Sequence, residues 1–475
     1  MLQRVGILLL AQVVSKGLAF VAFAWLARKL GASEYGAVEY AFGLTTFAAL
    51  AVEGGLGSVG VRRLAQGEQP AARLAALIPT AQTCIALVVV PAMIAFAAVF
   101  ANDARAVTLV AMVAVSVLML PWKQEWLFQE RGNMMPLAAS QILRAAVFAL
   151  GAVALVNGSS DVDRVGMLEI AAVAAATLYL MFVQARSIAP IRARVSRREL
   201  LDLGREAAPI GAAAIVWALI QYAPLLMLAN MAGMVDTAYF GAAHRLGVSL
   251  VTFSWIYHFN FYPTIAQRLV ADPDATAKLT RASFRIAAWA GIGVALALTL
   301  AAEPLLTTLY GDKFSASVAP FSVLVWTFPL TLLSGHARWM LVAARRARDM
   351  LVAQVAGGFV AIAAGVPLIA RFGMVGAAVT MVIACVTIWA VAQAFVTARV
   401  RVGPLAPCVR PAVVAAAIVG LAYGIEAAPW MACAAGVLAF TLAAPVVDRD
   451  LMRDLAHIRR ARSLRSHGGE VRDAR

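Results

Sequence analysis

The stretch WLARKLGASEYGAVEYAFGL, residues 25–44, places four charged residues and three glycines between two long apolar runs. Each flanking run is close to the roughly 20 residues that a helix needs to cross the hydrocarbon core of a membrane. Glycine permits tight turns, and charged side chains hold the ends of a span at the headgroups. The stretch therefore predicts two membrane helices joined by a short hairpin, with Gly31 and Gly36 forming the turn.

The composition extends this prediction to the whole chain. Of 475 residues, 62% are hydrophobic and only 14% are charged, with a mean hydropathy of +0.82. A soluble domain is nearer half apolar and a quarter charged, which excludes a soluble protein. We expect an all-α polytopic membrane protein with about 14 transmembrane helices. The predicted spans are 6–27, 36–60, 77–101, 105–122, 135–156, 166–185, 207–232, 235–262, 284–308, 318–343, 350–370, 374–397, 411–427 and 430–447.

The net charge is +15, and most of the basic residues lie in the connections between these spans and in the terminal segments. If the N-terminus is inside, thirty of the 40 Lys and Arg residues fall in the terminal segments and the connections on the inner side, and six fall in the outer connections. This bias is what the positive-inside rule requires, so both termini are predicted to be cytoplasmic. The excess of basic residues therefore indicates the membrane topology and does not indicate a nucleic-acid site. These residues are also expected to contact anionic membrane lipids.

Apart from Arg105 and Arg285 at the very start of their spans, four basic residues fall within predicted spans: Lys16, Arg144, Arg245 and Arg338. Such a charge costs about 2.5–3.5 kcal/mol at the centre of a lone helix, so it usually faces a bundle interior or a water-filled cavity. We expect Lys16 and Arg245 to face a cavity. Arg338 lies near one end of its span and is expected to extend to the membrane surface, while Glu53 is the expected counter-ion.

Other polar residues lie at helical spacing from these basic residues or from one another, so that they form polar stripes. One stripe contains Gln12 and Lys16; the others contain Ser140, Gln141 and Arg144; Arg245, Ser249 and Thr252; His244, Trp255 and His258; and Trp217, Gln221 and Tyr222. Residues at i, i+3, i+4 and i+7 share one face of a helix. The stripes indicate either an aqueous cavity between helix bundles or hydrogen bonding between packed helices. The second alternative explains one stripe more easily than several.

The chain also resembles itself. LARKLGASEYG at 26–36 is similar to LANMAGMVDTAYFG at 228–241, and the offset spans an even number of predicted helices. Parallel repeats of six helices predict two pseudo-symmetric lobes with a substrate site between them. The predicted organisation is an N-terminal lobe at 1–195, a basic cytoplasmic linker at 196–206, a C-terminal lobe at 207–400, two additional helices at 401–447 and a basic cytoplasmic tail at 448–475.

Several motifs resemble a known family. LARKLGASEYGAVEYAF at 26–42, GGLGSVGVRRLA at 54–65, YGDKFSAS at 310–317 and RFGMVGAAVT at 371–380 are similar to segments of the polysaccharide-unit flippases. These move O-antigen or exopolysaccharide repeat units and belong to the multidrug/oligosaccharidyl-lipid/polysaccharide transporter superfamily. The resemblance implies a protein of the bacterial inner membrane that flips a polyprenyl-pyrophosphate-linked oligosaccharide by alternating access, for the synthesis of lipopolysaccharide or exopolysaccharide.

The resemblance also implies roles for individual residues. Lys16, Arg144 and Arg245 would bind the pyrophosphate. Gln12, Trp217, Gln221, Tyr222 and Trp255 would contact sugars, although packing explains the aromatic residues equally well. Glu53, His244 and His258 are the candidates for ion coupling. The implied partners are the lipid-linked oligosaccharide, membrane lipids and, as candidates, a polymerase and a chain-length regulator.

Two other functions remain as alternatives. A multidrug or organic-cation antiporter of the same fold would favour acidic residues in its cavity, whereas basic residues predominate here. A polytopic glycosyltransferase or polymerase would need an acidic or metal-binding motif on a sizeable loop, and DVD at 161–163 lies in a short one. The chain lacks the G-x-x-x-x-G-K-[ST] and H-E-x-x-H motifs. No catalytic residue, cofactor or metal ligand is expected.

Overall fold

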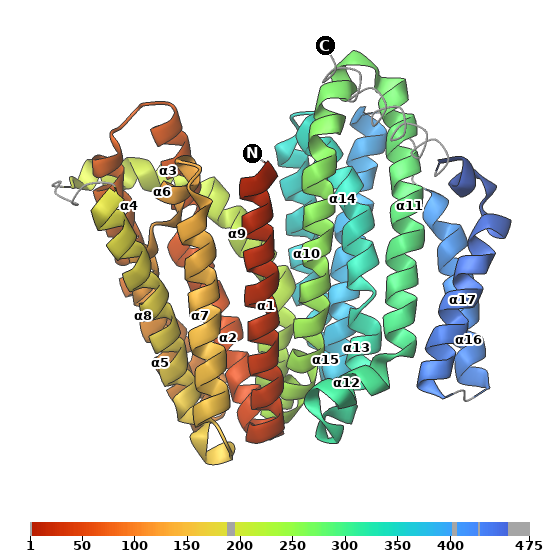
Figure 1. The fold of residues 1–475 in the computed structure, drawn as a ribbon, viewed down its shortest axis with the longest axis horizontal. Coiled ribbons are helices and arrows are strands. Elements are labelled where there is room, and N and C mark those ends of the chain that lie inside the picture. The colour runs from red at the N-terminus through yellow and green to blue at the C-terminus, as the bar shows by residue number, and fades with distance from the viewer. Residues whose placement is uncertain (1, 188–194, 401–405, 426–427, 455–475) are drawn as a thin grey trace, which may run out of the picture. The chain divides into compact units, whose positions relative to one another are not determined.

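The computed structural model describes residues 2–187, 195–400, 406–425 and 428–454, and all regular elements in these ranges are helical (Figure 1). The α-helices before residue 233 are α1 (Leu2–Leu30), α2 (Ala32–Glu53), α3 (Leu56–Ala65), α4 (Ala71–Phe100), α5 (Ala104–Met119), α6 (Glu125–Glu130), α7 (Met134–Leu155), α8 (Val162–Ser187) and α9 (Arg197–Ala232). Those after it are α10 (Met234–Ala271), α11 (Pro273–Leu300), α12 (Ala302–Tyr310), α13 (Val318–Leu324), α14 (Thr327–Ala343), α15 (Ala347–Phe395), α16 (Val409–Gly424) and α17 (Pro429–Val447).

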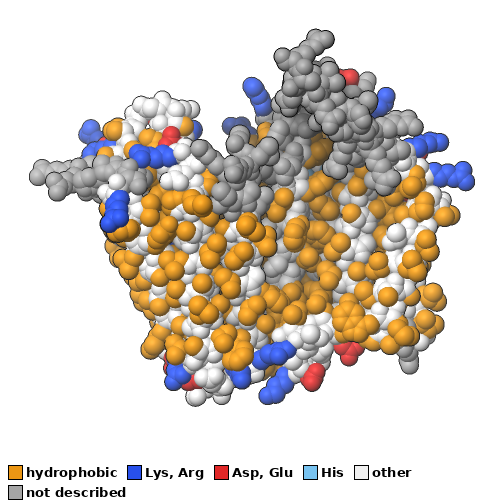
Figure 2. Space-filling model, in the orientation of Figure 1, with side chains coloured by type: hydrophobic (Ala, Val, Ile, Leu, Met, Phe, Trp, Pro, Cys, Tyr) orange, Lys and Arg blue, Asp and Glu red, His pale blue; other side chains and the backbone are white. Residues whose placement is uncertain are grey.

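Within the described part of the chain, eleven helices are long and apolar enough to cross a membrane, and α16 is a shorter apolar helix. Every predicted span falls on one or two of the helices above. Hydrophobic side chains cover most of the visible face along the helices, and Lys and Arg lie near the helix ends (Figure 2). The protein is thus an all-α polytopic membrane protein, as the composition predicts.

Glycines interrupt the helices at two places, one within a predicted span and one between two predicted spans. The span at 36–60 is broken into α2 and α3, because Gly54 and Gly55 adopt left-handed conformations with φ of 53° and 74°. The spans at 350–370 and 374–397 both belong to α15, which bends sharply at Gly373 (φ 53°, ψ −130°). Glycine accepts these backbone angles without the steric cost that a side chain brings, so the breaks occur where the sequence supplies glycine.

The chain forms two compact units, which are described separately. Unit 1 contains Met1–Ala242, Leu309–Ser317 and Ala361–Thr380, and unit 2 contains Ala243–Thr308, Val318–Val360 and Met381–Arg475. In unit 1, α1 packs on α7, α7 packs on α8, and α2 packs on α5 and α9. In unit 2, α11 contacts α14, α16 and α17. The predicted tail lies outside the described residues from position 455 onward.

The hairpin of residues 25–44 turns at one glycine. Gly31 has a φ of 85° between α1 and α2, while Glu34 forms an ion pair of 2.8 Å with Arg105. The predicted role of Gly36 in the turn is wrong, because this residue lies within α2. A Cβ atom at Gly36 would approach the carbonyl oxygen of Met234 to 1.8 Å, so the glycine permits close packing between α2 and the start of α10.

The internal similarity is visible in the backbone. Gly31 (φ 85°, ψ 167°) and its counterpart Gly233 (φ 90°, ψ 179°) have nearly the same conformation. In each hairpin the glycine carbonyl accepts a bond from the amide four residues later, that of Tyr35 at 3.0 Å or Thr237 at 3.2 Å. The two hairpins are therefore equivalent in local geometry as well as in sequence.

The segment predicted as a linker, 196–206, forms the first turns of α9. The Ser196 side chain accepts a bond from the Glu199 amide, and the Glu199 side chain accepts one from the Ser196 amide, which is a capping box. The Glu199 carboxylate also pairs with Arg73 at 2.6 Å, and Glu206 pairs with Arg63. These contacts join the N-terminal end of α9 to α3 and α4 within unit 1.

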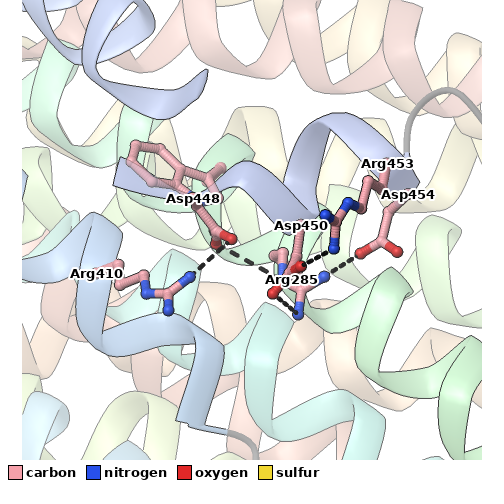
Figure 3. Close-up of polar contacts among 7 residues, drawn as sticks. Arg285, Arg410, Asp448, Asp450, Arg453 and Asp454 are labelled. Atoms are coloured by element: carbon pink, nitrogen blue, oxygen red, sulfur yellow. Dashed lines mark hydrogen bonds and ion pairs between the residues drawn. The ribbon is translucent and has the colours of Figure 1, made fainter. Parts of the chain in front are cut away.

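The last two helices of unit 2 are attached by ionic contacts. Asp448, which ends α17 and has no exposed surface, accepts bonds from Arg410 at 3.0 Å and from the Trp289 indole at 3.2 Å (Figure 3). Arg285 of α11 lies 3.6 Å from Asp448 and also pairs with Asp454. We name Arg285, Trp289, Arg410, Asp448, Asp450, Arg453 and Asp454 the C-terminal ion cluster.

Candidate functional site

A cavity lies within unit 2, among α10, α14 and the first part of α15. Its volume is about 300 Å³, at the lower end of the range that is typical of ligand pockets. We call it the unit 2 cavity. It is lined by Ser254, Trp255, His258, Arg338, Trp339, Val342, Met350 and Gln354.

Arg338 is the charged residue of this lining. Its terminal nitrogen lies 3.4 Å from the carbonyl oxygen of Thr331, two turns earlier in α14, at the long end of the hydrogen-bond range. Its Nε atom is buried and has no hydrogen-bond partner among the described residues. The prediction that Arg338 extends to the nearby membrane surface is wrong, because its side chain runs back toward the N-terminal end of the helix, as helical side chains usually tilt.

Two tryptophans form the aromatic part of the cavity. The rings of Trp255 and Trp339 lie 6.3 Å apart at an angle of 87°, and Tyr262 lies 5.0 Å from Trp339. Trp255 is 49% exposed. Trp255 was among the predicted sugar contacts, whereas Trp339 was not identified. It follows Arg338 directly, and an Arg-Trp pair within an apolar span was the signal.

His258 contributes a buried nitrogen to the cavity. The residue is 1% exposed; its Nδ1 lies 2.8 Å from the Ser254 carbonyl oxygen, and its Nε2 has no partner among the described residues. Its ring lies 5.0 Å from the ring of His336. Gly335 makes room for this contact, since a Cβ atom there would lie 2.2 Å from Cε1 of His258.

His336 connects His258 to further polar groups. Its Nε2 lies 3.1 Å from the Ser283 hydroxyl and 3.3 Å from the Tyr257 hydroxyl. These residues come from α10, α11 and α14 and form one buried polar network beside the unit 2 cavity. Only His258 of this network was predicted as a functional residue from the sequence, although His336 is also an ionisable residue within a span, which is itself a functional signal.

Arg144 has a partner that the sequence did not reveal. It forms an ion pair of 2.5 Å with Glu169, which joins α7 to α8 and is 4% exposed. The expected counter-ion, Glu53, makes no ion pair among the described residues, and its carboxylate accepts a bond from the Gly55 amide at the break between α2 and α3. Glu53 also lines a second cavity, of about 380 Å³, together with Lys123.

The ion pair between Arg144 and Glu169 should contribute to the stability of the protein. Arg144→Gln leaves the buried Glu169 carboxylate unpaired and should cost about 2 kcal/mol of unfolding free energy. Glu169→Gln should cost less, because the Arg144 side chain that it leaves unpaired is 45% exposed, whereas the Glu169 carboxylate is almost fully buried. Thermal unfolding of the purified variants tests the order. The double variant should be less destabilised than the sum of the two, and additive losses would contradict a coupled pair.

The other predicted residues lie on both units. In unit 1, Gln12 and Lys16 are exposed on α1. The Trp217 and Tyr222 rings of α9 lie 6.5 Å apart beside Gln221, which is 8% exposed.

In unit 2, His244 is 4% exposed and Arg245 is half-buried, both on α10. The hydroxyl of Ser249, a member of the same predicted stripe, donates to the Arg245 carbonyl at 2.8 Å. The roles assigned to these residues and to those of unit 1, and a lumen shared by Lys16 and Arg245, stay predictions.

The fold is similar to those of known membrane transporters. The chain is similar to the lipid II flippase MurJ in its inward closed conformation, with a TM-score of 0.75 and 11% identity over 93% of this chain and 99% of that one. It is also similar to an inward-facing multidrug resistance MATE family transporter of the MOP superfamily, with a TM-score of 0.67 and 13% identity over 81% and 94% of the two chains.

A third similar structure is the eukaryotic MATE transporter AtDTX14, with a TM-score of 0.55 and 13% identity over 85% of this chain and 96% of that one. No curated protein sequence matches the chain. Residues 1–269 match the family described as polysaccharide biosynthesis protein. Since this match covers more than half of the 475 residues, the chain belongs to the polysaccharide biosynthesis protein family, and its fold is similar to those of MurJ and the MATE transporters.

Proposed function

We propose that this protein flips a polyprenyl-pyrophosphate-linked oligosaccharide across the bacterial inner membrane by alternating access, for the synthesis of a surface polysaccharide. The observation that carries the proposal is the unit 2 cavity, in which a cation and two tryptophans lie among membrane-spanning helices. The family and the fold support the same function. In this proposal both termini are cytoplasmic, and the partners are the lipid-linked oligosaccharide and the enzymes that polymerise it.

The main energetic barrier to such transport is the transfer of the polar headgroup through the membrane. The polyprenyl tail can stay in the bilayer, but sugars and pyrophosphate lose hydration there at a cost of several kcal/mol for each unpaired polar group. Cationic donors offset this cost through charge-assisted hydrogen bonds to phosphate. Lys16 on unit 1 and Arg245 on unit 2 are the proposed donors, and Glu53, His244 and His258 are the proposed coupling groups.

The charge of the unit 2 cavity argues against transport of organic cations. Arg338 is positive, and the described lining contains no carboxylate. A cationic substrate near an unpaired guanidinium would be repelled in this low-dielectric environment. An anionic or neutral sugar is therefore favoured over a cation as the cargo.

Complementation tests the proposal. Deletion of the gene from its own host should abolish the surface polymer, and the wild-type chain should restore it. Lys16→Ala and Arg245→Ala should lose most of this activity, whereas Lys16→Arg and Arg245→Lys should retain part of it, because the charge remains but the geometry changes. Surface polymer is scored by immunoblot beside the level of protein in the membrane.

Arg205→Ala is the matched control, since this arginine has an 81% exposed side chain and precedes the predicted span at 207–232. It should complement fully. Full complementation by both Lys16→Ala and Arg245→Ala would remove the proposed cationic path. A deletion strain with normal surface polymer would remove the proposed function altogether.

A further inference from the structure

We propose that the unit 2 cavity binds a sugar that carries a carboxylate, with the carboxylate on Arg338 and the sugar ring against Trp255 and Trp339. This inference rests on the proposed function, because the sugar would belong to the lipid-linked oligosaccharide. It adds a substrate class, an acidic sugar, and a binding site distinct from the predicted pyrophosphate contacts.

The charge of the cavity selects a singly charged anion. The Arg338 guanidinium has one long contact to a backbone carbonyl, and its buried Nε has no partner among the described residues. A carboxylate can accept two parallel bonds from a guanidinium and would satisfy this nitrogen. A pyrophosphate carries more negative charge and would require further cations, which the described lining does not supply.

The aromatic side chains select a ring. A pyranose has an apolar face of C–H groups, which loses contact with water favourably when it packs on an indole. Trp255 offers such a face, being half exposed, and Trp339 stands nearly perpendicular to it. A free phosphate or a linear anion would use the guanidinium and leave both indoles without contact.

The hydroxyl groups of a sugar match the remaining polar atoms. Nδ1 of His258 faces a carbonyl oxygen, which can only accept, so Nδ1 carries the proton in the neutral ring. Nε2 then has a lone pair that can accept a hydrogen bond from a hydroxyl group, and this nitrogen is buried without a partner among the described residues. Gln354 supplies an amide that can both donate and accept.

Calorimetry on the full chain in phosphatidylcholine nanodiscs tests the inference. Glucuronate should bind, and glucose should bind about tenfold more weakly or worse, because it lacks the group that pairs with the guanidinium. Inorganic phosphate should also bind more weakly than glucuronate. Arg338→Gln should reduce glucuronate affinity about tenfold or more, Trp339→Ala should reduce both sugars, and Arg205→Gln should match the wild type.

Arg338→Lys is the control that distinguishes lost binding from misfolding. It keeps the charge and should bind glucuronate with intermediate affinity. Equal binding of glucose and glucuronate, tighter binding of phosphate, unchanged binding by Arg338→Gln, or no binding of glucuronate would each overturn the inference. Its failure is distinct from that of the proposed function. A chain that complements but does not bind glucuronate removes only the acidic-sugar site, and one that binds but does not complement removes only the transport proposal.

Discussion

Gly36→Ala should abolish accumulation of the folded protein in the membrane. The added methyl group would lie 1.8 Å from the carbonyl oxygen of Met234 and 2.6 Å from its carbonyl carbon. Both are backbone atoms, which cannot rotate away as the end of a side chain can. Overpacking a core usually costs about 1–3 kcal/mol, and a clash between two helix backbones should exceed that range.

Gly420→Ala is the matched control. Gly420 also lies within a membrane helix, α16, but a Cβ atom there meets nothing within 4 Å. This change should be neutral or stabilise the protein by up to about 1 kcal/mol, because alanine favours the helix. Fluorescence-detected size exclusion of tagged variants, with a thermal melt, measures both. Equal yields and melting temperatures for the two variants would contradict the packing role of Gly36.

Asp448→Asn should release the α16–α17 hairpin from α11. Asp448 is fully buried and accepts bonds from Arg410 and Trp289, with Arg285 at 3.6 Å. Removing one partner from a buried ionic contact costs about 3–5 kcal/mol, and the exposure of Arg410 places this case near the lower end. We therefore expect a loss of about 3 kcal/mol in the attachment of the hairpin.

Cys433 reports this release directly. Its thiol lies 3.4 Å from the Ala297 carbonyl on α11 and should become reactive toward a maleimide when the hairpin separates. The measurement uses a chain in which the other three cysteines are replaced. Asp450→Asn is the control, because Asp450 belongs to the same C-terminal ion cluster but is half exposed. Labelling of Cys433 that is equally slow in both variants would show that Asp448 does not hold the hairpin.

The fold was largely predictable because hydrophobic length decides it. Each predicted span lies on described helices, and the similarity between residues 26–36 and 228–241 has a counterpart in the structure, where the two hairpins have the same backbone geometry. The break after Glu53 was missed, since two adjacent glycines within an apolar run fit a continuous span as well as a broken one. The role of Gly36 was assigned to the turn because sequence distance does not reveal which helix packs on it.

The candidate site was less predictable, because it depends on the rotation of each helix about its axis. The partner of Arg144 is Glu169 on the next helix, and no spacing rule joins residues across a loop. His258 and Arg338 belong to helices far apart in the sequence and meet at one cavity only through packing. The sequence could identify ionisable residues within spans, but not which of them converge.

The packing of Gly36 against Met234 also has a consequence for synthesis. The two residues are separated by most of the first half of the chain, so α2 enters the membrane long before its partner exists. At the usual rate of roughly 5–20 residues per second, the ribosome needs on the order of ten to forty seconds to reach Met234 after Gly36. During that interval lipid or an insertion chaperone must cover the surface of α2 around Gly36, and final assembly of unit 1 must wait even longer, until residues 309–317 and 361–380 have been made.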